Sequence, residues 1–265
     1  MSGYIERVKE LRLVEINSSF HLSKDDLWAM FDVAKPIILD GHFELLSGKH
    51  SAMFFRFPAI SQYPRYASEI SKEMVACIEK IKCKEGKIIV PEIDVVLGPT
   101  SHGMFFAFDI ASKLKKRSAY ALFDEGTGKP IKKLAEGYDI GRGDKVLIIN
   151  DMTTTGTGID SMIKLVEEDY HAEVIGVCLF ANRGIGVKLV EEIKNKVRFF
   201  HSIINIDMPS WPKDGCQLCK DGVHLILSKD IHHLPIYSRE DEFERITKYQ
   251  RENQYQRQES QPHCN

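Results

Sequence analysis

The sequence predicts an α/β fold with a central parallel sheet flanked by helices. Short runs of Val, Ile and Leu recur along the 265 residues, as in strands that are buried on both faces of a parallel sheet. Segments in which apolar residues follow helical spacing separate these runs. This alternation builds a parallel sheet whose ligands sit at the carboxyl ends of the strands.

Along the chain, residues 1–36 are expected to form a helical region that Pro36 ends. Residues 37–60 alternate apolar and polar side chains around Ser47 and Gly48, a pattern that predicts a hairpin or two short strands. The remaining expected helices are residues 68–81, 103–114, 159–168 and 187–194, and the expected strands are residues 93–97, 119–123, 146–149, 174–180 and 199–206.

Two segments fall outside this alternation. Residues 124–144 exceed the usual connection of about 2–6 residues, which predicts a functional, mobile loop. The tail from about residue 240 is rich in Gln, Glu and Arg, and is expected to be a solvated helix or disordered. We therefore expect an N-terminal helical region (1–36), a central domain with a hood (37–206) and a C-terminal extension (207–265).

Bulk composition narrows the class of protein. A net charge of −2 gives no reason to expect a nucleic-acid partner. No stretch approaches the roughly 20 apolar residues of a membrane span, and residues 1–12 lack the core of a signal peptide. The six cysteines show no framework spacing. We therefore expect a cytoplasmic protein with reduced thiols and no membrane partner.

The most informative segment is Val146-Leu-Ile-Ile-Asn-Asp-Met-Thr-Thr-Thr-Gly-Thr-Gly158. An apolar strand runs into a loop of hydroxyls and glycines, and a helix follows. Free backbone N–H groups at a helix N-terminus, together with the helix dipole, bind anions. The carboxylate of Asp151 could hold sugar hydroxyls or a metal. The segment therefore predicts a site for a sugar phosphate, although a tight turn of any α/β protein is the simpler alternative.

This segment resembles the motif with which type I phosphoribosyltransferases bind phosphoribosyl pyrophosphate (PRPP). The resemblance implies the type I phosphoribosyltransferase fold, with an N-terminal hood and a C-terminal extension. The chain departs from the family at Asn150, where an acidic residue is usual, and at Thr153, where an apolar one is usual. The ribose and 5′-phosphate ligands that the resemblance implies are Asn150, Asp151, Thr153, Thr154, Thr155, Gly156, Thr157 and Gly158.

A second strand, turn and helix start occur at Val95-Val-Leu-Gly-Pro-Thr-Ser-His-Gly103. Its backbone amides could hold a second anion. The equivalent loop of the family holds pyrophosphate, which implies that role for Thr100, Ser101, His102 and Gly103. The alternative for His102 is that it caps a turn.

The segment Gly41-His-Phe-Glu-Leu-Leu-Ser-Gly-Lys-His-Ser-Ala-Met-Phe-Phe55 resembles the hood of orotate phosphoribosyltransferases. The base-binding residues implied are Phe43, Leu46, Ser47 and, after a later strand, Arg183. Leu46 stands where the family has a lysine that contacts orotate, and Leu46 cannot pair with a carboxylate. A neutral or differently shaped base therefore remains an alternative to orotate, and a salt-bridged surface arginine remains an alternative role for Arg183.

The long loop of the orotate enzymes opens with basic residues that neutralise the departing pyrophosphate. Asp124 and Glu125 occupy those positions here and would repel it. Lys129 and Lys132 come later and could take over as part of a lid, so they join Asp151 as candidate catalytic residues. The alternative is that these lysines are solvated surface residues.

Cys216 and Cys219 form a Cys-x-x-Cys pair, which supplies two of the four ligands that a structural zinc needs. Two free thiols in a turn are the simpler interpretation. A zinc site would require partners from a dimer mate or from the histidines His201, His224, His232 and His233.

The resemblance implies a PRPP-dependent transferase that moves phosphoribose to a nucleobase and releases pyrophosphate. Mg²⁺ is the implied cofactor, held indirectly by Asp151, and a homodimer is the implied assembly. Asn150, Asp124 and Glu125 leave a second hypothesis open, a non-catalytic regulator that binds PRPP or a nucleotide. A third hypothesis, hydrolysis of a nucleotide, has no specific support in the sequence.

Overall fold

The computed structural model describes residues 3–45, 47–100, 102–123 and 130–231. The chain divides into two compact units. The first unit comprises Met1–Met30 and Ser61–Asp207, and the second comprises Phe31–Ile60 and Met208–Asn265. None of the helices within the described ranges is long and apolar enough to cross a membrane.

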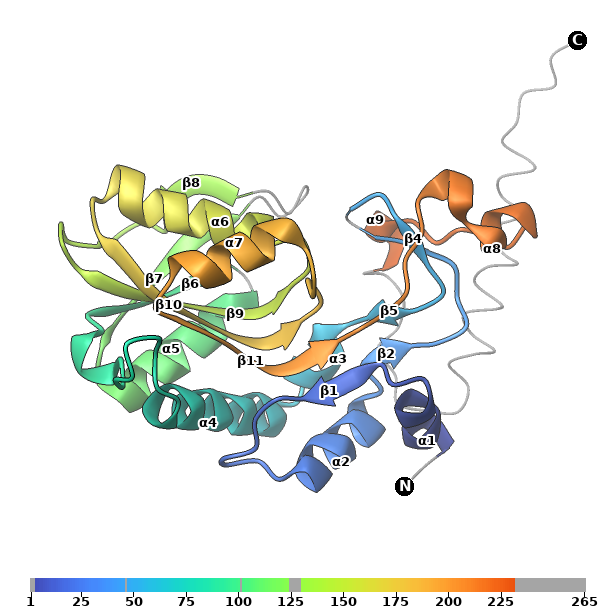
Figure 1. Ribbon diagram of the computed structural model, residues 1–265, viewed down its shortest axis with the longest axis horizontal. Coiled ribbons are helices and arrows are strands. Elements are labelled where there is room, and N and C mark those ends of the chain that lie inside the picture. The colour runs from blue at the N-terminus through green and yellow to red at the C-terminus, as the bar shows by residue number, and fades with distance from the viewer. Residues whose placement is uncertain (1–2, 46, 101, 124–129, 232–265) are drawn as a thin grey trace, which may run out of the picture. The chain divides into compact units, whose positions relative to one another are not determined.

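The first unit is built around a seven-stranded sheet with the order β1-β11-β10-β9-β6-β7-β8 (Figure 1). The strands are β1 (Val14–Ile16), β6 (Val95–Pro99), β7 (Arg117–Phe123), β8 (Pro130–Leu134), β9 (Lys145–Thr153), β10 (Glu173–Asn182) and β11 (Phe199–Ile206). From β11 to β7, neighbouring strands are parallel, which confirms the predicted parallel sheet. The outer strands β1 and β8 are antiparallel to their neighbours.

Helices cover both faces of this sheet, as the alternating sequence pattern predicts. Figure 1 shows α6 and α7 on one face and α4 and α5 on the other. The helices of the first unit are α1 (Gly3–Glu10), α4 (Pro64–Lys80), α5 (His102–Leu114), α6 (Thr157–Lys164) and α7 (Lys188–Lys196), while α2 (Lys24–Ala34) crosses the unit boundary. A π-helical turn (Leu165–Asp169) extends α6, and a 3₁₀ turn (Val90–Glu92) precedes β6.

The core of the first unit explains the continuous apolar run of β9. Val146 and Ile148 belong to a buried cluster that includes Ile159 and Ile163 of α6. Leu147 alternates to the opposite face of the sheet and is also fully buried. Because both faces are covered, the strand needs apolar side chains at every position.

Two predictions about the edges of the sheet were wrong. Residues 130–134, expected to belong to a mobile loop, form β8, while residues 124–129 lie outside the described part of the chain. Residues 14–16, expected within a helical region, form β1 and pair with residues 204–206. Edge strands are often short and polar, so their sequences show little of the apolar alternation that identifies a strand.

A buried carboxylate attaches the N-terminal segment to α4. Glu73 is fully buried, and its Oε1 accepts a hydrogen bond from the backbone N–H of Phe20 at 2.9 Å. Its Oε2 accepts from the N–H groups of His21 and Leu22 at 2.6 and 2.7 Å. Three consecutive amides thus satisfy one buried charge, as a buried carboxylate requires.

The second unit contains two short antiparallel pairs, which confirm the expected hairpin within residues 37–60. β3 (Phe43–Glu44) pairs with β4 (His50–Ser51), and β2 (Ile37–Ile38) pairs with β5 (Phe54–Phe55). Its helical elements are α3 (Phe57–Ser61), a 3₁₀ turn (Lys213–Gly215), α8 (Gln217–Lys220) and α9 (Ser228–Ile231). A small apolar cluster holds the unit together and comprises Ile38, Phe43, Ile226 and Ile231, with Phe54 packed against it.

Candidate functional site

The two loops predicted to bind anions follow neighbouring strands of the first unit. The chain passes from β6 outward to β7 and from β9 outward to β10 on the other side, so the strand order reverses between β6 and β9. Such a reversal opens a crevice outside the carboxyl ends of the strands, where α/β proteins bind ligands. The parallel register of β6, β9 and β10 brings the loops after all three strands to this edge.

The loop after β6 is tight. A Cβ atom added to Gly98 would lie 2.6 Å from the carbonyl oxygen of Gly103, and one added to Gly103 would lie 2.3 Å from Cδ of Pro99. Only glycine therefore fits at either position. The Cβ added to Gly103 would also lie 3.1 Å from Oδ1 of Asn150, so the start of α5 lies against the end of β9.

Thr100 fixes this loop to β7. Its backbone N–H donates to the carbonyl of Ala121 at 2.8 Å, and its hydroxyl accepts from the N–H of Phe123 at 3.0 Å. Thr100 is thus engaged with the neighbouring strand. Ser101 lies outside the described residues, as does the side chain of His102.

The loop after β9 has the backbone shape that the glycines predict. Gly156 adopts a φ of +84°, which favours glycine, and α6 begins at the next residue. The exposed hydroxyls of Thr155 and Thr157 lie 3.0 Å apart at the N-terminus of α6, where the N–H of Thr157 also donates to the Thr155 hydroxyl at 3.4 Å. Thr153, in contrast, is buried at the end of β9, and Thr154 is half-buried.

Asn150 and Asp151 shape the end of β9. The amide of Asn150 accepts from the N–H of Asp151 at 2.9 Å and donates to the carbonyl of Met152 at 3.0 Å. Oδ1 of Asp151 accepts from the N–H of Met152 at 2.7 Å. Asn150 is thus committed to local backbone contacts, and the half-buried Asp151 supplies the carboxylate of this strand end.

The loop after β10 lies against the loop after β9. The backbone N–H of Arg183 donates to the carbonyl of Thr153 at 2.8 Å, and a Cβ added to Gly184 would lie 2.5 Å from the carbonyl oxygen of Thr154. Burial lowers the pKa of the Arg183 guanidinium to about 10. Within the described ranges, this guanidinium makes no ion pair or side-chain hydrogen bond, so it is a candidate for binding an anionic ligand.

β7 ends near the same loops. A Cβ added to Gly158 would lie 3.5 Å from the ring of Phe123, which is the last residue of β7. Lys129 lies outside the described residues, and Lys132 belongs to β8 but its side chain is not described.

The candidate base-binding residues of the hood belong to the second unit. Phe43 is fully buried in the small apolar cluster, where its ring packs on Gly41, so its described environment is that of a core residue. Ser47 is exposed at the turn of the β3–β4 hairpin, and Leu46 lies outside the described residues.

The second unit also holds Cys216 and Cys219, which lie beside His42 and His50. Sequence analysis missed these two histidines. Of the partners considered there, His201 belongs to the first unit, His224 is not part of the cluster, and His232 and His233 lie outside the described residues. The hairpin register indicates that the two histidines are close. Glu44 pairs with His50, and His42, two residues before Glu44, is expected on the same face as Glu44.

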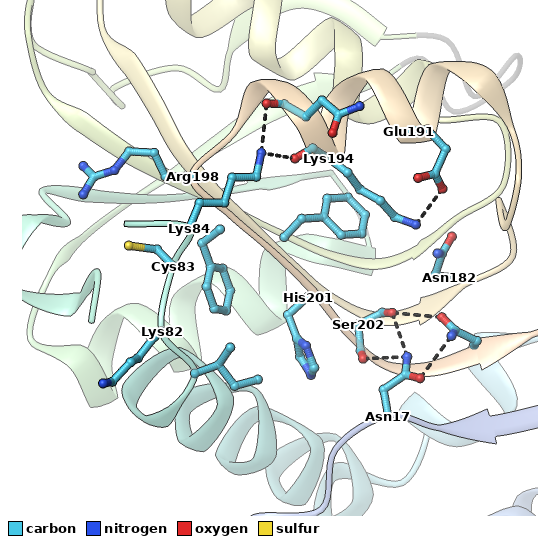
Figure 2. Close-up of a pocket in the computed structure, with 15 residues that line it drawn as sticks. Asn17, Lys82, Cys83, Lys84, Asn182, Glu191, Lys194, Arg198, His201 and Ser202 are labelled. Carbon is cyan, nitrogen blue, oxygen red and sulfur yellow. Dashed lines mark hydrogen bonds and ion pairs between the residues drawn. The ribbon is translucent and has the colours of Figure 1, made fainter. Parts of the chain in front are cut away.

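The first unit also has a pocket of about 540 Å³, lined by residues of β11, α7 and the chain after α4 (Figure 2). Most of the basic side chains that line this pocket already have hydrogen-bond or ion-pair partners within the protein. Lys194 pairs with Glu191, Arg198 pairs with glutamates, and Lys84 donates to two carbonyls at the end of α7. The three loops therefore remain the candidate ligand site of this unit.

Comparison with known proteins gives consistent matches. A family model described as a phosphoribosyl transferase domain matches residues 68–214. An orotate phosphoribosyltransferase of a Thermoanaerobacter species is 33% identical over 193 residues, which cover 72% of this chain and 89% of the relative. Its counterpart in Caldanaerobacter subterraneus is 32% identical over 208 residues, covering 77% and 96%. The crystal structure of orotate phosphoribosyltransferase from Aeropyrum pernix shares the fold, with a TM-score of 0.50 at 18% identity over 67% of this chain and 90% of that one.

Proposed function

Because this chain belongs to the phosphoribosyltransferase family, we propose that it transfers phosphoribose from PRPP to a nucleobase, with orotate as the acceptor. The C1–O bond to pyrophosphate breaks, and a bond forms from C1 to a ring nitrogen of the base, which loses its proton. Pyrophosphate leaves with the bonding electron pair. The observation that carries the proposal is the meeting of two glycine-dependent loops at the reversal of strand order.

The loop after β9 is the proposed 5′-phosphate site. Backbone N–H groups from Thr154 to Gly158 and the hydroxyls of Thr155 and Thr157 surround the open N-terminus of α6. Helix N-termini of this kind bind phosphate through amides and dipole. Thr153 contributes through its backbone, because its side chain is buried.

The loop after β6 is the proposed pyrophosphate site. Thr100 to Gly103 lead into the 13-residue helix α5, and the missing Cβ atoms of Gly98 and Gly103 keep the loop closed. Because Gly103 lies close to Asn150, the two proposed anion sites would both adjoin the end of β9. A ribose that joins a 5′-phosphate to a pyrophosphate fits between two such sites.

Asp151 is the proposed partner of the ribose hydroxyls. Its carboxylate is an oxygen donor of the kind that suits Mg²⁺, which when bound would neutralise charge on the pyrophosphate. Asn150 holds the strand end in shape through its two backbone contacts. Holding the sugar between nucleophile and leaving group then supplies most of the catalysis.

Arg183 is the proposed partner of the anionic base. Orotate carries a carboxylate, and a partly buried guanidinium without an ion pair within the described ranges is suited to bind it. Leu46, in place of the lysine that the family uses, offers no charge for this carboxylate. We further propose that Lys129 and Lys132 neutralise the leaving pyrophosphate in place of Asp124 and Glu125, and that the enzyme acts as a dimer.

The relatives named as enzymes favour catalysis over the alternative of a PRPP sensor. The test is pyrophosphate release from PRPP and Mg²⁺ with orotate, uracil, hypoxanthine and adenine as acceptors. We expect turnover with orotate and at least a hundredfold drop in kcat for Asp151→Asn, about 2.7 kcal/mol of transition-state stabilisation. The exposed Asp139→Asn is the matched control.

Measurable PRPP binding with no turnover of any base would support the sensor and contradict the enzyme. Turnover with a purine but not with orotate would contradict only the acceptor. Unchanged activity of Asp151→Asn would contradict the assignment of the ribose site.

A further inference from the structure

Four side chains of the second unit converge on one point. Nε2 of His42 lies 3.0 Å from Nδ1 of His50, 3.4 Å from Sγ of Cys216 and 3.6 Å from Sγ of Cys219. Sγ of Cys219 lies 3.2 Å from Nδ1 of His50. All four ligand atoms fall within 4.8 Å of one another, and only Cys219 is not fully buried.

The four side chains crowd around a single nitrogen, Nε2 of His42. Nδ1 of His42 lies 2.8 Å from the carbonyl of Val223, which can only accept, so Nδ1 carries the hydrogen. Nε2 of the neutral ring then has a single lone pair. Three atoms approach that lone pair, only one of them can donate to it, and Cys219 then has Nδ1 of His50 as its other hydrogen-bond partner. A cation at the centre would instead accept one lone pair from each group.

The geometry fits one tetrahedral ion. Zinc bonds of about 2.3 Å to sulfur and about 2.05 Å to nitrogen give edges of about 3.3 Å between nitrogens and about 3.6 Å between nitrogen and sulfur. Four of the six pairs of ligand atoms are separated by 3.0 to 3.6 Å, and all pairs lie within 4.8 Å. Two cysteines and two histidines in tetrahedral array select zinc.

We propose that His42, His50, Cys216 and Cys219 bind one structural zinc ion. Four protein ligands complete the coordination shell and leave no open position for substrate. The bond from His42 Nδ1 to the carbonyl of Val223 orients the ring, as the outer-shell partner of a zinc ligand does.

The site lies where the second unit needs support. Its described strands are two residues long, and its apolar cluster is small. Small cores gain stability from structural metals. The ion would fasten the β3–β4 hairpin to α8, beside the reciprocal backbone hydrogen bonds of His50 and Trp211 at 2.8 Å.

The test begins with the reduced full-length chain, loaded with zinc and dialysed against metal-free buffer. We expect about one zinc per chain, released by a mercurial that blocks thiols and detected with a chromogenic chelator. Cys219→Ser and His42→Gln should each lose the bound zinc. Cys83→Ser should retain it, because that thiol lies elsewhere and hydrogen-bonds Glu85.

Cobalt keeps the proposal testable where a variant fails to fold. The wild-type chain loaded with Co²⁺ should show intense tetrahedral d–d bands and thiolate-to-cobalt charge transfer. A wild-type chain that binds no zinc, or a Cys216→Ala, Cys219→Ala double variant that keeps it, would overturn the proposal. Iron with acid-labile sulfide in place of zinc would also overturn it.

Discussion

Replacing Arg183 with methionine should stabilise the unliganded protein and weaken binding of the proposed acceptor orotate. Burial lowers the pKa of this guanidinium by more than two units, to about 10. One pKa unit corresponds to about 1.4 kcal/mol, so burial disfavours the charged form by at most about 3 kcal/mol. Contact with solvent reduces this, and we expect a gain of about 1–2 kcal/mol in the free energy of unfolding.

The sign of this effect does not change near neutral pH. Below pH 10 the arginine is protonated in both the folded and the unfolded chain, so the penalty of the folded state is fully present at pH 7. Methionine has a similar length and no charge, so packing is largely retained. Loss of a charge-assisted hydrogen bond should raise the KM for orotate by between about tenfold and about a hundredfold.

The assay pairs urea unfolding with steady-state kinetics. Arg198→Met is the contrasting control, because Arg198 donates two hydrogen bonds to the Glu92 carboxylate at 2.9 and 2.8 Å. That variant should lose stability and keep its KM for orotate. An Arg183→Met protein that is less stable than wild type and binds orotate equally well would refute the reasoning, because the guanidinium would then have a protein partner.

Three further substitutions test other parts of the first unit. Glu73→Gln should lower the free energy of unfolding by about 2–4 kcal/mol, because an amide cannot accept three backbone N–H bonds. The exposed Glu79→Gln on the same helix should change that free energy little. Equal urea midpoints for the two variants would contradict this prediction. Gly103→Ala should lower the free energy of unfolding by about 1–3 kcal/mol through overpacking and should raise the KM for PRPP. Gly215→Ala should be tolerated, because its added Cβ would lie 3.6 Å from the nearest neighbour. A stable Gly103→Ala protein with a normal KM would contradict this prediction and show that the loop can relax. Burial lowers the pKa of His201 to about 4, so folding favours the neutral form and the protein loses stability as the pH falls from 6.5 through 4. Between pH 7 and pH 5, the free energy of unfolding of the wild type should fall by about 2 kcal/mol more than that of His201→Gln. Parallel pH profiles for the two proteins would argue against the shift.

The sequence predicts the centre of the fold better than its edges. β9 and β10 are buried on both faces, which requires the apolar runs that identify them. β8 carries Pro130 and two lysines, and β1 has three residues that pair with a strand almost two hundred positions away. Neither has a local pattern that distinguishes it from a loop.

In the candidate site, too, local features can be predicted from the sequence and long-range contacts cannot. The glycine and hydroxyl loops are local in sequence, so their position at the strand ends follows from the pattern alone. Phe43 matches a base-binding motif but packs in a core that includes Ile226, which only the tertiary structure brings to it. His42 contacts Cys216 and His50 contacts Cys219 across more than 160 residues, a separation at which spacing in the sequence carries no information.

The pairing of early with late segments has a consequence for the order of synthesis. β1 is made long before β11, its partner in the sheet. Likewise the β3–β4 hairpin pairs with Trp211 and Ile226, which are made far later. During synthesis on the ribosome, both of these early segments must therefore wait unpaired for their partners. The β3–β4 hairpin completes its pairing only after Ile226 has emerged.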